Sequence, residues 1–301
     1  MKARTVLLAI GIVGGLLPGR AQPPDVPPEG EALQLTRDPA ADHSPAWRPD
    51  GKALAFVSNR QGGTHLWIVA DNGQFERKLT DTGNNSSPTF SPDGKEIAFV
   101  SDRAGAPHIW KMTADGANPQ PLTRYNESEP AWSPDGEWIA FISQRTGGPA
   151  LWIMRRDGTA QTLLVQVPGK SLAHPTWSPD GQEIFFAANI AGTFDLWACR
   201  RDGTALRQVT TSLKTEEAPH RSPQGELLAF ASDLSGQWEI WATPAGGGPL
   251  IQLTEWKAET RSPAWSPDGR RLAVVSTKSG NPDIWILRVP PGLWPPARPK
   301  G

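Results

Sequence analysis

Short apolar runs recur at a nearly constant spacing along this chain, with polar residues concentrated between them. Residues 96–101, which read Glu-Ile-Ala-Phe-Val-Ser, show the pattern, because apolar side chains follow one another there almost without alternation. A β-strand of this composition has both faces covered, whereas a half-exposed strand alternates between apolar and polar residues. The pattern therefore predicts strands that pack between neighbouring sheets.

A turn of the form Ser-Pro-Asp-Gly precedes each of these runs. Proline presets φ at the first turn position, aspartate hydrogen-bonds its own backbone, and glycine accepts a positive φ. The turn occurs six times, with Arg48 in place of the first serine and Gln224 in place of the fifth aspartate. The prolines are separated by 43, 42, 45, 44 and 44 residues, a period that suits one four-stranded blade. The sequence thus predicts an all-β, six-bladed β-propeller of four-stranded antiparallel blades.

The sixth repeat lacks a fourth strand, because only four residues follow Trp285 before the chain reaches prolines. Residues 33–36 at the other end, Leu-Gln-Leu-Thr, copy the Leu-Thr ending of the other repeats. We therefore expect this N-terminal strand to complete blade 6 and close the ring, which removes two exposed sheet edges. Residues 31–289 then form the propeller, and residues 290–301 are expected to be a Pro-rich, disordered tail.

Large aromatic residues occupy two equivalent positions in the repeats, one just ahead of the turn and one in the third strand. Aromatic side chains bury about 150–250 Å² each. Because a ligand-stacking site does not recur once per structural repeat, these residues are predicted to form the core between blades. They are Trp47, Phe90, Trp132, Trp177 and Trp265 ahead of the turns, and Trp67, Trp110, Trp152, Trp197, Trp241 and Trp285 in the third strands.

The whole repeat resembles that of a known family. Pro-x-Trp-Ser-Pro-Asp-Gly-Lys-x-Ile-Ala-Phe, followed by Ser-x-Arg-x-Gly, Ile-Trp, Asp-Gly and Leu-Thr, is similar to the repeat of TolB-type propellers of the bacterial cell envelope. The resemblance covers residues 31–289 and implies a six-bladed ring that binds protein partners rather than catalysing a reaction. TolB proper carries an α/β domain ahead of the propeller, whereas here residues 22–30 alone separate the leader from the first strand.

The N-terminal segment predicts export. Lys2 and Arg4 precede an apolar run over residues 6–17, and the small residues Gly19 and Ala21 suit a cleavage site. We interpret residues 1–21 as a signal peptide and residues 22–30 as a Pro-rich linker, which places the mature protein in the periplasm or outside the cell without a stable transmembrane segment. Without the leader the chain has 27 basic and 31 acidic residues, a formal charge of −4 that argues against nucleic-acid binding.

The predicted loops fall on two opposite faces of the ring. The Pro-Asp-Gly turns and the later Asp-Gly hairpins are short and define a turn face. The loops after Leu-Thr and around Ser-x-Arg-x-Gly are longer and more varied, and they define a loop face where we expect a protein partner to bind. The candidate partner-binding residues on this face are Tyr125, Glu127, Glu129, Glu217, Trp238, Trp256 and Arg261.

Signatures of catalysis are few. The chain has no Gly-x-Ser-x-Gly, glycine-rich phosphate loop or His-Glu-x-x-His, so we assign no catalytic residue, cofactor or metal ligand. Two alternatives stay open. A TolB-like family of pectin lyases uses a histidine-bound metal, and all five histidines are expected on the loop face near acidic residues, which keeps a metal-dependent carbohydrate-active or peptide-acting enzyme in view. The other alternative is a glycan or small-ligand binding module. The histidines are His43, His65, His108, His174 and His220.

Blade 5 departs from its own pattern. Arg221 stands where the other repeats have Trp or Phe, next to the altered turn at Gln224. A charge between blades must be paired or reach water, and the nearby acids Glu216 and Glu217 are candidate partners. The alternative is neutral drift at a tolerant position.

The leader generates the first testable prediction. Cleavage after Ala21 should leave Gln22 as the mature N-terminus. Intact-mass spectrometry of the exported protein measures this directly. Recovery of the chain in the membrane fraction with Met1 still present would replace secretion with membrane anchoring.

Overall fold

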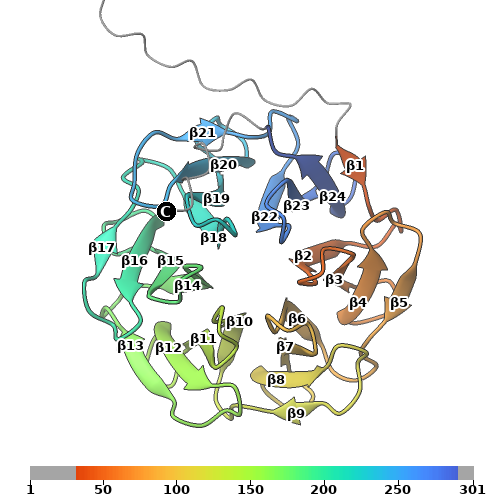
Figure 1. Ribbon diagram of the computed structural model, residues 1–301, viewed down its shortest axis with the longest axis horizontal. Helices are drawn as coiled ribbons and strands as arrows, with labels where there is room; N and C mark the ends of the chain where they lie inside the picture. Colours follow the sequence, from red (N-terminus) through yellow and green to blue (C-terminus); the bar gives the residue numbers. More distant parts are fainter. Residues whose placement is uncertain (1–31, 291–301) are drawn as a thin grey trace, which may run out of the picture.

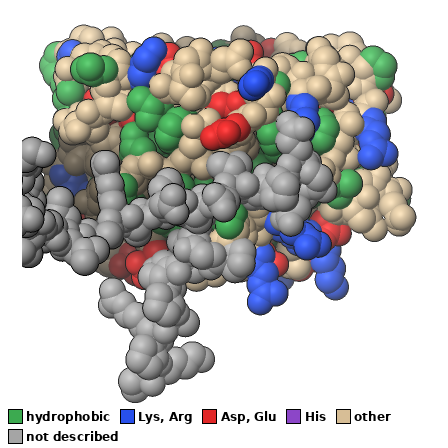
Figure 2. All heavy atoms as spheres, turned by 90° about the horizontal axis from the view of Figure 1, so that it is seen from above, with side chains coloured by type: hydrophobic (Ala, Val, Ile, Leu, Met, Phe, Trp, Pro, Cys, Tyr) green, Lys and Arg blue, Asp and Glu red, His purple; other side chains and the backbone are tan. Residues whose placement is uncertain are grey.

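The computed structural model describes residues 32–290, which form a closed ring of six β-sheets around a central channel (Figure 1). Each sheet has four antiparallel strands, so the predicted all-β, six-bladed propeller is confirmed. Seen edge-on, the ring is a flat disc whose rim carries apolar side chains scattered among polar ones (Figure 2). No helix long and apolar enough to cross a membrane occurs among residues 32–290.

Every blade runs from an inner strand beside the channel to an outer strand at the rim. In this order the blades are β2 (Asp42–Trp47), β3 (Ala53–Ser58), β4 (His65–Ala70) and β5 (Glu76–Lys78); β6 (Asn85–Phe90), β7 (Glu96–Ser101), β8 (His108–Thr113) and β9 (Gln120–Pro121); β10 (Glu127–Trp132), β11 (Trp138–Ser143), β12 (Ala150–Arg155) and β13 (Thr162–Val165); β14 (Leu172–Trp177), β15 (Glu183–Ala188), β16 (Asp195–Arg200) and β17 (Arg207–Gln208); β18 (Glu216–Arg221), β19 (Leu227–Ser232), β20 (Glu239–Pro244) and β21 (Ile251–Gln252); and β22 (Thr260–Trp265), β23 (Arg271–Ser276), β24 (Asp283–Arg288) and β1 (Leu33–Gln34).

The second strand of each blade is the most buried, as its unbroken apolar pattern predicts. In β7, Ile97, Ala98 and Phe99 have no exposed surface. These strands lie between two neighbouring blades, so both of their faces are covered. The aromatics of the inner strands are buried as well, and those of the third strands are buried or half-buried, which confirms their place in the core.

Neighbouring blades are joined by one recurring contact. The aromatic residue at the end of an inner strand packs against an alanine in the second strand of the preceding blade, as Trp177 does with Ala140. In two blades the indole N–H also reaches across the interface: Trp47 donates to the Ala264 carbonyl and Trp177 to the Ala131 carbonyl, both at 3.0 Å. At five of the six interfaces a large aromatic residue thus meets an alanine, which sets the spacing between blades.

The ring is closed by the N-terminal strand, as predicted. β1 pairs antiparallel with β24, with Leu33 opposite Ile286. Leu35 is buried, and the Thr36 hydroxyl accepts a hydrogen bond from the Ile284 N–H at 2.9 Å. Thr80 makes the same bond in blade 1, so the Leu-Thr motif fastens the outer edge of a blade to its third strand. The predicted signal peptide, the linker and residues 291–301 of the tail lie outside the described residues.

This closure can be tested by truncation. Removal of residues 31–36 should lower the free energy of unfolding by more than about 3 kcal/mol, because it uncovers blade 6 and removes the buried Leu35. Chemical denaturation of the purified mature protein gives the value. Removal of residues 291–301 is the control and should change it little; equal destabilisation by the two truncations would contradict a ring closed by β1.

Candidate functional site

A β-bulge in every inner strand shapes the channel. The register of each inner strand shifts against the second strand, and the bulged residue, which always precedes a proline, has φ between 49° and 56°. A non-glycine residue rarely adopts this conformation, so its presence in all six blades marks it as a requirement of the fold. The six residues are Ser44, Ser87, Glu129, His174, Ala218 and Ser262.

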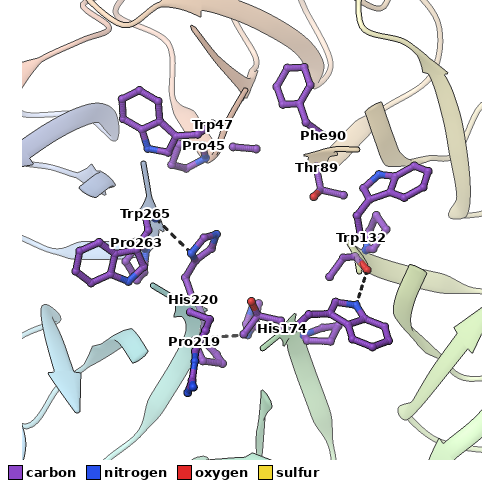
Figure 3. Close-up of a pocket in the computed structure, with 18 of the residues that line it drawn as sticks. Pro45, Trp47, Thr89, Phe90, Trp132, His174, Pro219, His220, Pro263 and Trp265 are labelled. Atoms are coloured by element: carbon purple, nitrogen blue, oxygen red, sulfur yellow. Dashed lines mark hydrogen bonds between the residues drawn. The ribbon is translucent and has the colours of Figure 1, made fainter. Parts of the chain in front are cut away.

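The inner strands enclose a cavity of about 670 Å³ in the channel, lined by prolines, aromatic residues and the bulged positions (Figure 3). The ionisable lining residues all come from blades 3, 4 and 5; they are Glu129, His174, His220 and Arg221. Blades 1, 2 and 6 contribute Ser, Thr, Ala, Pro and aromatic side chains instead. The channel is therefore polarised, with its charged and titratable groups on one side.

Two histidines link the charged side of the channel from blade to blade. Glu129 accepts a hydrogen bond from the His174 backbone N–H at 2.5 Å, and its other carboxylate oxygen lies 3.5 Å from Nε2 of His174. Nδ1 of His174 accepts from the Ala218 N–H at 3.4 Å. Nδ1 of His220 accepts from the Trp265 N–H at 3.3 Å (Figure 3).

Burial within the channel lowers the pKa of His220 to about 4, so its ring is neutral at pH 7. The prediction that every histidine lies on the loop face is wrong for His220, because it follows the bulge and lies in the half of its strand nearer the turn. The described part of the chain contains no group of three His, Cys, Asp or Glu side chains arranged to hold a metal ion.

The first group of loop-face candidates lies at the border of blades 2 and 3. Tyr125 is 57% exposed, and its ring stacks against the Arg145 guanidinium, whose Cζ lies 4.6 Å from the ring centre. Glu127 is buried, pairs with Arg145 at 2.7 Å and accepts from the Tyr125 N–H at 3.0 Å. Glu127 therefore holds Tyr125 and Arg145 in place from below, and its carboxylate is not on the surface.

The second group lies at the border of blades 5 and 6. The Arg261 guanidinium lies flat over Trp238, 3.6 Å from the ring centre, and forms ion pairs with Glu217 and Glu259. Trp256 and Trp238 both pack against the hydrophobic cluster between these blades. The structure thus brings Glu217, Trp238, Trp256 and Arg261 to one border, and it leaves Glu129 apart from them in the channel.

The Ser-x-Arg motif has a structural role that sequence analysis missed. Nε of Arg145 donates to Ser143 at 2.9 Å, and the same guanidinium pairs with Glu127 at the start of the inner strand. Arg60 and Arg103 make the equivalent bonds in blades 1 and 2. Arginine occupies this position in blades 1, 2 and 3, whereas blades 4, 5 and 6 have Ile190, Leu234 and Lys278. This difference between the repeats is the sequence signal that could have revealed the role.

Loss of this arginine leaves a buried carboxyl group in blade 5. Glu216 occupies the position of Glu127, but residues 32–290 provide it with no cationic partner. It accepts a hydrogen bond from the Thr210 hydroxyl, and its second oxygen has no partner in the same part of the chain. Burial raises the pKa of Glu216, and the nearby Asp195 carboxyl adds to the effect. Burial likewise raises the pKa of Asp195.

Arg221 does not pair with Glu216 or Glu217, which lie at the opposite end of β18; the expectation of such a pair is wrong. The Arg221 guanidinium lies over the Phe185 ring instead, with Cζ 4.6 Å from its centre. Phe185 occupies the position where the second strands of the other five blades have alanine. The Phe185 side chain of blade 4 therefore fills the space that an aromatic residue of the next blade takes at the other interfaces. The alanines are Ala55, Ala98, Ala140, Ala229 and Ala273.

Fold and site together define a six-bladed propeller with a polarised channel and an aromatic and charged loop face. The family model described as the TolB beta propeller domain matches residues 29–129 and 114–260. These matches cover more than half of the chain, so the protein belongs to the TolB β-propeller domain family.

Solved structures agree. A TolB structure from Agrobacterium tumefaciens is 23% identical over 86% of this chain and 97% of its own, with a TM-score of 0.71. TolB from Acinetobacter baumannii is 24% identical over 77% of this chain and 59% of its own, with a TM-score of 0.70. The matched structures also include an oligogalacturonate lyase in complex with manganese, 16% identical over 88% of this chain and 94% of its own, with a TM-score of 0.62. Each of these likenesses shows the fold alone.

A curated relative, the uncharacterized peptidase YuxL of Bacillus subtilis, is 40% identical over 53 residues. This segment is 17% of this chain and 8% of the relative, so the chain spans only a small part of that protein's length. The comparisons therefore contain propellers of enzymes as well as TolB proteins.

The contrast between Glu216 and Glu127 gives a prediction about pH and stability. Because the pKa of Glu216 is raised in the folded protein, its contribution to stability is present at low pH and is lost as the pH rises through the folded-state pKa. Glu216→Gln should therefore raise the melting temperature by about 2–4 °C at pH 8, equivalent to about 1 kcal/mol in a domain of this size, and by less at pH 5.

Glu127→Gln is the matched control. It should lower the stability by about 2 kcal/mol or more at pH 8, because the largely buried Arg145 then lacks an anionic partner. Thermal unfolding of both variants at the two pH values measures the difference. Destabilisation by Glu216→Gln at pH 8 would contradict the view that this carboxyl group lacks a compensating charge.

Proposed function

We propose that this protein is an exported, periplasmic or secreted propeller that acts as a protein–protein interaction module of the bacterial cell envelope and binds its partner through the loop face. The observation that carries the proposal is the arrangement of Trp238, Arg261 and Glu217 at the border of blades 5 and 6. Membership of the TolB β-propeller domain family supports it.

The loop-face residues have the chemistry of an interface centre. Trp, Tyr and Arg are the residue types that most often dominate binding energy at protein interfaces. Arg261 keeps 32% of its side chain exposed although Trp238 and two carboxylates hold it in place. A side chain that is already ordered loses little conformational entropy on binding, which favours affinity.

Tyr125 offers a second anchor on the same face. Its exposed ring is held by Arg145 and, through its backbone, by Glu127. At the border of blades 5 and 6, Trp256 adds to the group around Arg261, and it packs against Trp285 with ring centres 5.7 Å apart. In this proposal the buried Glu127 holds Tyr125 and Arg145 in position for binding, and Glu129 contributes to partner binding from the channel.

Export rests on the charged and apolar pattern of residues 1–21, and an envelope role rests on the resemblance of the repeat to TolB-type propellers. A metal-dependent carbohydrate-active or peptide-acting enzyme is the second candidate, favoured by the lyase with manganese among the structures of this fold. Metal analysis of the purified protein and a glycan array separate this candidate and a glycan-binding module from a protein-binding propeller.

Site-specific photo-crosslinking tests which face binds. A photo-reactive phenylalanine derivative placed at Tyr125 or Lys257 on the loop face should yield a crosslinked partner in envelope extract, whereas the same group at Lys95 or Asp157 on the turn face should yield none. All four positions are exposed, so the variants should fold alike.

Replacement of Glu217 and Arg261 together by alanine should weaken capture of the same partner by about tenfold or more, since both members of the ion pair are removed and no unpaired charge is created between them. An unchanged melting temperature serves as the control for folding. Crosslinks formed only from Lys95 or Asp157 would reverse the assignment of the two faces.

A further inference from the structure

A ring of prolines surrounds the mouth of the channel on the turn face. Each inner strand ends in a turn whose proline lines the cavity, and every one of these prolines is exposed or half-buried. In five blades the glycine of the turn lies beside the turn proline of the preceding blade, and in the sixth Gly269 lies beside Gln224, so the ring is continuous. We call it the proline collar. Its members are Pro49, Pro92, Pro134, Pro179, Pro223 and Pro267.

Negative charge borders this apolar collar. An exposed aspartate follows the collar proline in every turn except that of blade 5. Two of these carboxylates have an arginine partner at 3.6 and 3.8 Å, whereas Asp93, Asp180 and Asp268 form no ion pair among residues 32–290. The Ser91 hydroxyl lowers the pKa of Asp93, so this carboxylate is ionised at pH 7. The mouth therefore fits an occupant with apolar surface and positive charge.

The described chain leaves the propeller on this same face. The Val289 N–H donates to the Arg270 carbonyl at 2.9 Å, and Arg270 directly follows the turn of blade 6. Strand β24 is separated from the inner strand β22 by two strand spacings, which is about 10 Å. Four extended residues span about 13 Å. Residues 291–294 are therefore long enough to bring Trp294 to the mouth of the channel.

The segment that follows has the composition that the collar requires. Residues 291–301 read Pro-Gly-Leu-Trp-Pro-Pro-Ala-Arg-Pro-Lys-Gly and contain no acidic residue. Leu293 and Trp294 supply apolar surface, and aromatic rings pack well against prolines. Arg298 and Lys300 supply positive charge that complements the turn aspartates. The four prolines of the segment restrict its backbone in advance, which lowers the entropy lost on docking.

We propose that residues 291–300 dock over the turn-face mouth of the channel, with Trp294 in the proline collar and Arg298 and Lys300 against the turn aspartates. The covalent tether gives the segment a local concentration in the millimolar range, so a weak contact is sufficient to populate the docked state. A weak contact also agrees with the small loss of stability expected when residues 291–301 are removed. Docking closes the turn-face end of the channel and leaves the loop face as its open end.

A peptide of residues 290–301 with a C-terminal fluorescein label tests the proposal by fluorescence anisotropy. It should bind the mature chain that lacks residues 291–301 with a Kd of about 1 mM or lower. The full mature chain should bind the same peptide at least about threefold more weakly, because its own segment competes for the collar.

Two peptide variants separate the apolar contribution from the charged one. The Trp294→Ala peptide should bind at least about tenfold more weakly, because the aromatic anchor is lost. The peptide with Arg298→Glu and Lys300→Glu should also bind more weakly at low salt. The difference between this peptide and the original one should shrink in 1 M NaCl, where exposed charges are screened.

A variant of the propeller locates the site. Pro92→Lys together with Pro134→Lys removes apolar surface from the collar and adds positive charge, so it should weaken peptide binding by about tenfold or more. Pro121→Lys is the matched control, because Pro121 is equally exposed but lies on the outer strand β9 and does not line the cavity. It should leave binding unchanged. Melting temperatures of both variants verify that they are folded.

Several outcomes would overturn the proposal. These are the absence of peptide binding to the truncated chain, equal binding to the truncated and full chains, or undiminished binding to the collar variant. Sedimentation of the full mature chain adds a further one, since dimers that disappear on removal of residues 291–301 would show that the segment docks on a second copy instead. The proposal is independent of the loop-face partner surface, so loss of partner capture there has no bearing on these measurements.

Discussion

The contact between a large aromatic residue and an alanine of the preceding blade is the interaction on which the ring depends. A single blade has two apolar faces, and each is covered only when a neighbour is present. The contact fixes how closely two blades approach, and six such spacings must add up to a closed circle. A change of size at one interface therefore requires a compensating change at the same interface, and Phe185 opposite Arg221 is an example.

Departures from the repeat are concentrated in blades 4 and 5. Blades 1, 2 and 3 keep the Ser-x-Arg motif and pin their inner strands with it. Blades 4, 5 and 6 have lost the arginine of this motif. Blades 4 and 5 also contain buried carboxyl groups, both channel histidines and the one inner-strand arginine that replaces an aromatic residue. Repeated residues serve the ring in every blade alike, whereas residues that break the repeat are free to carry a specific function.

Much of the fold could be predicted from the sequence because it is repeated. Six copies of one turn revealed the blade number, and the copied ending at Leu35-Thr36 revealed how the ring closes. Features that depend on the partner of a single residue could not be predicted this way. Glu127 reads as a surface charge until Arg145 is seen to cover it, and the left-handed residue ahead of each inner proline has no sequence preference of its own.

The partner of Arg221 could not be predicted from the sequence for a similar reason. Glu216 and Glu217 are close to Arg221 in the sequence, but they lie at the opposite end of the extended strand β18, so closeness along the chain does not predict an ion pair here. Aligning the second strands of the six repeats reveals a better signal, since Phe185 is alone in a column of alanines. The size of the residue at the facing position, rather than its charge, therefore predicts the contact of Arg221.

The pairing of β1 with β24 also governs when the protein can become native. Leu33 and Ile286 are partners although about 250 residues separate them, and the first strand to be synthesised must wait for the last. Such non-local pairing slows folding, since the chain pays the entropy of closing a very long loop before the final blade is complete. Until then blade 6 presents an open edge, so the protein needs protection from aggregation for longest at the end of its synthesis.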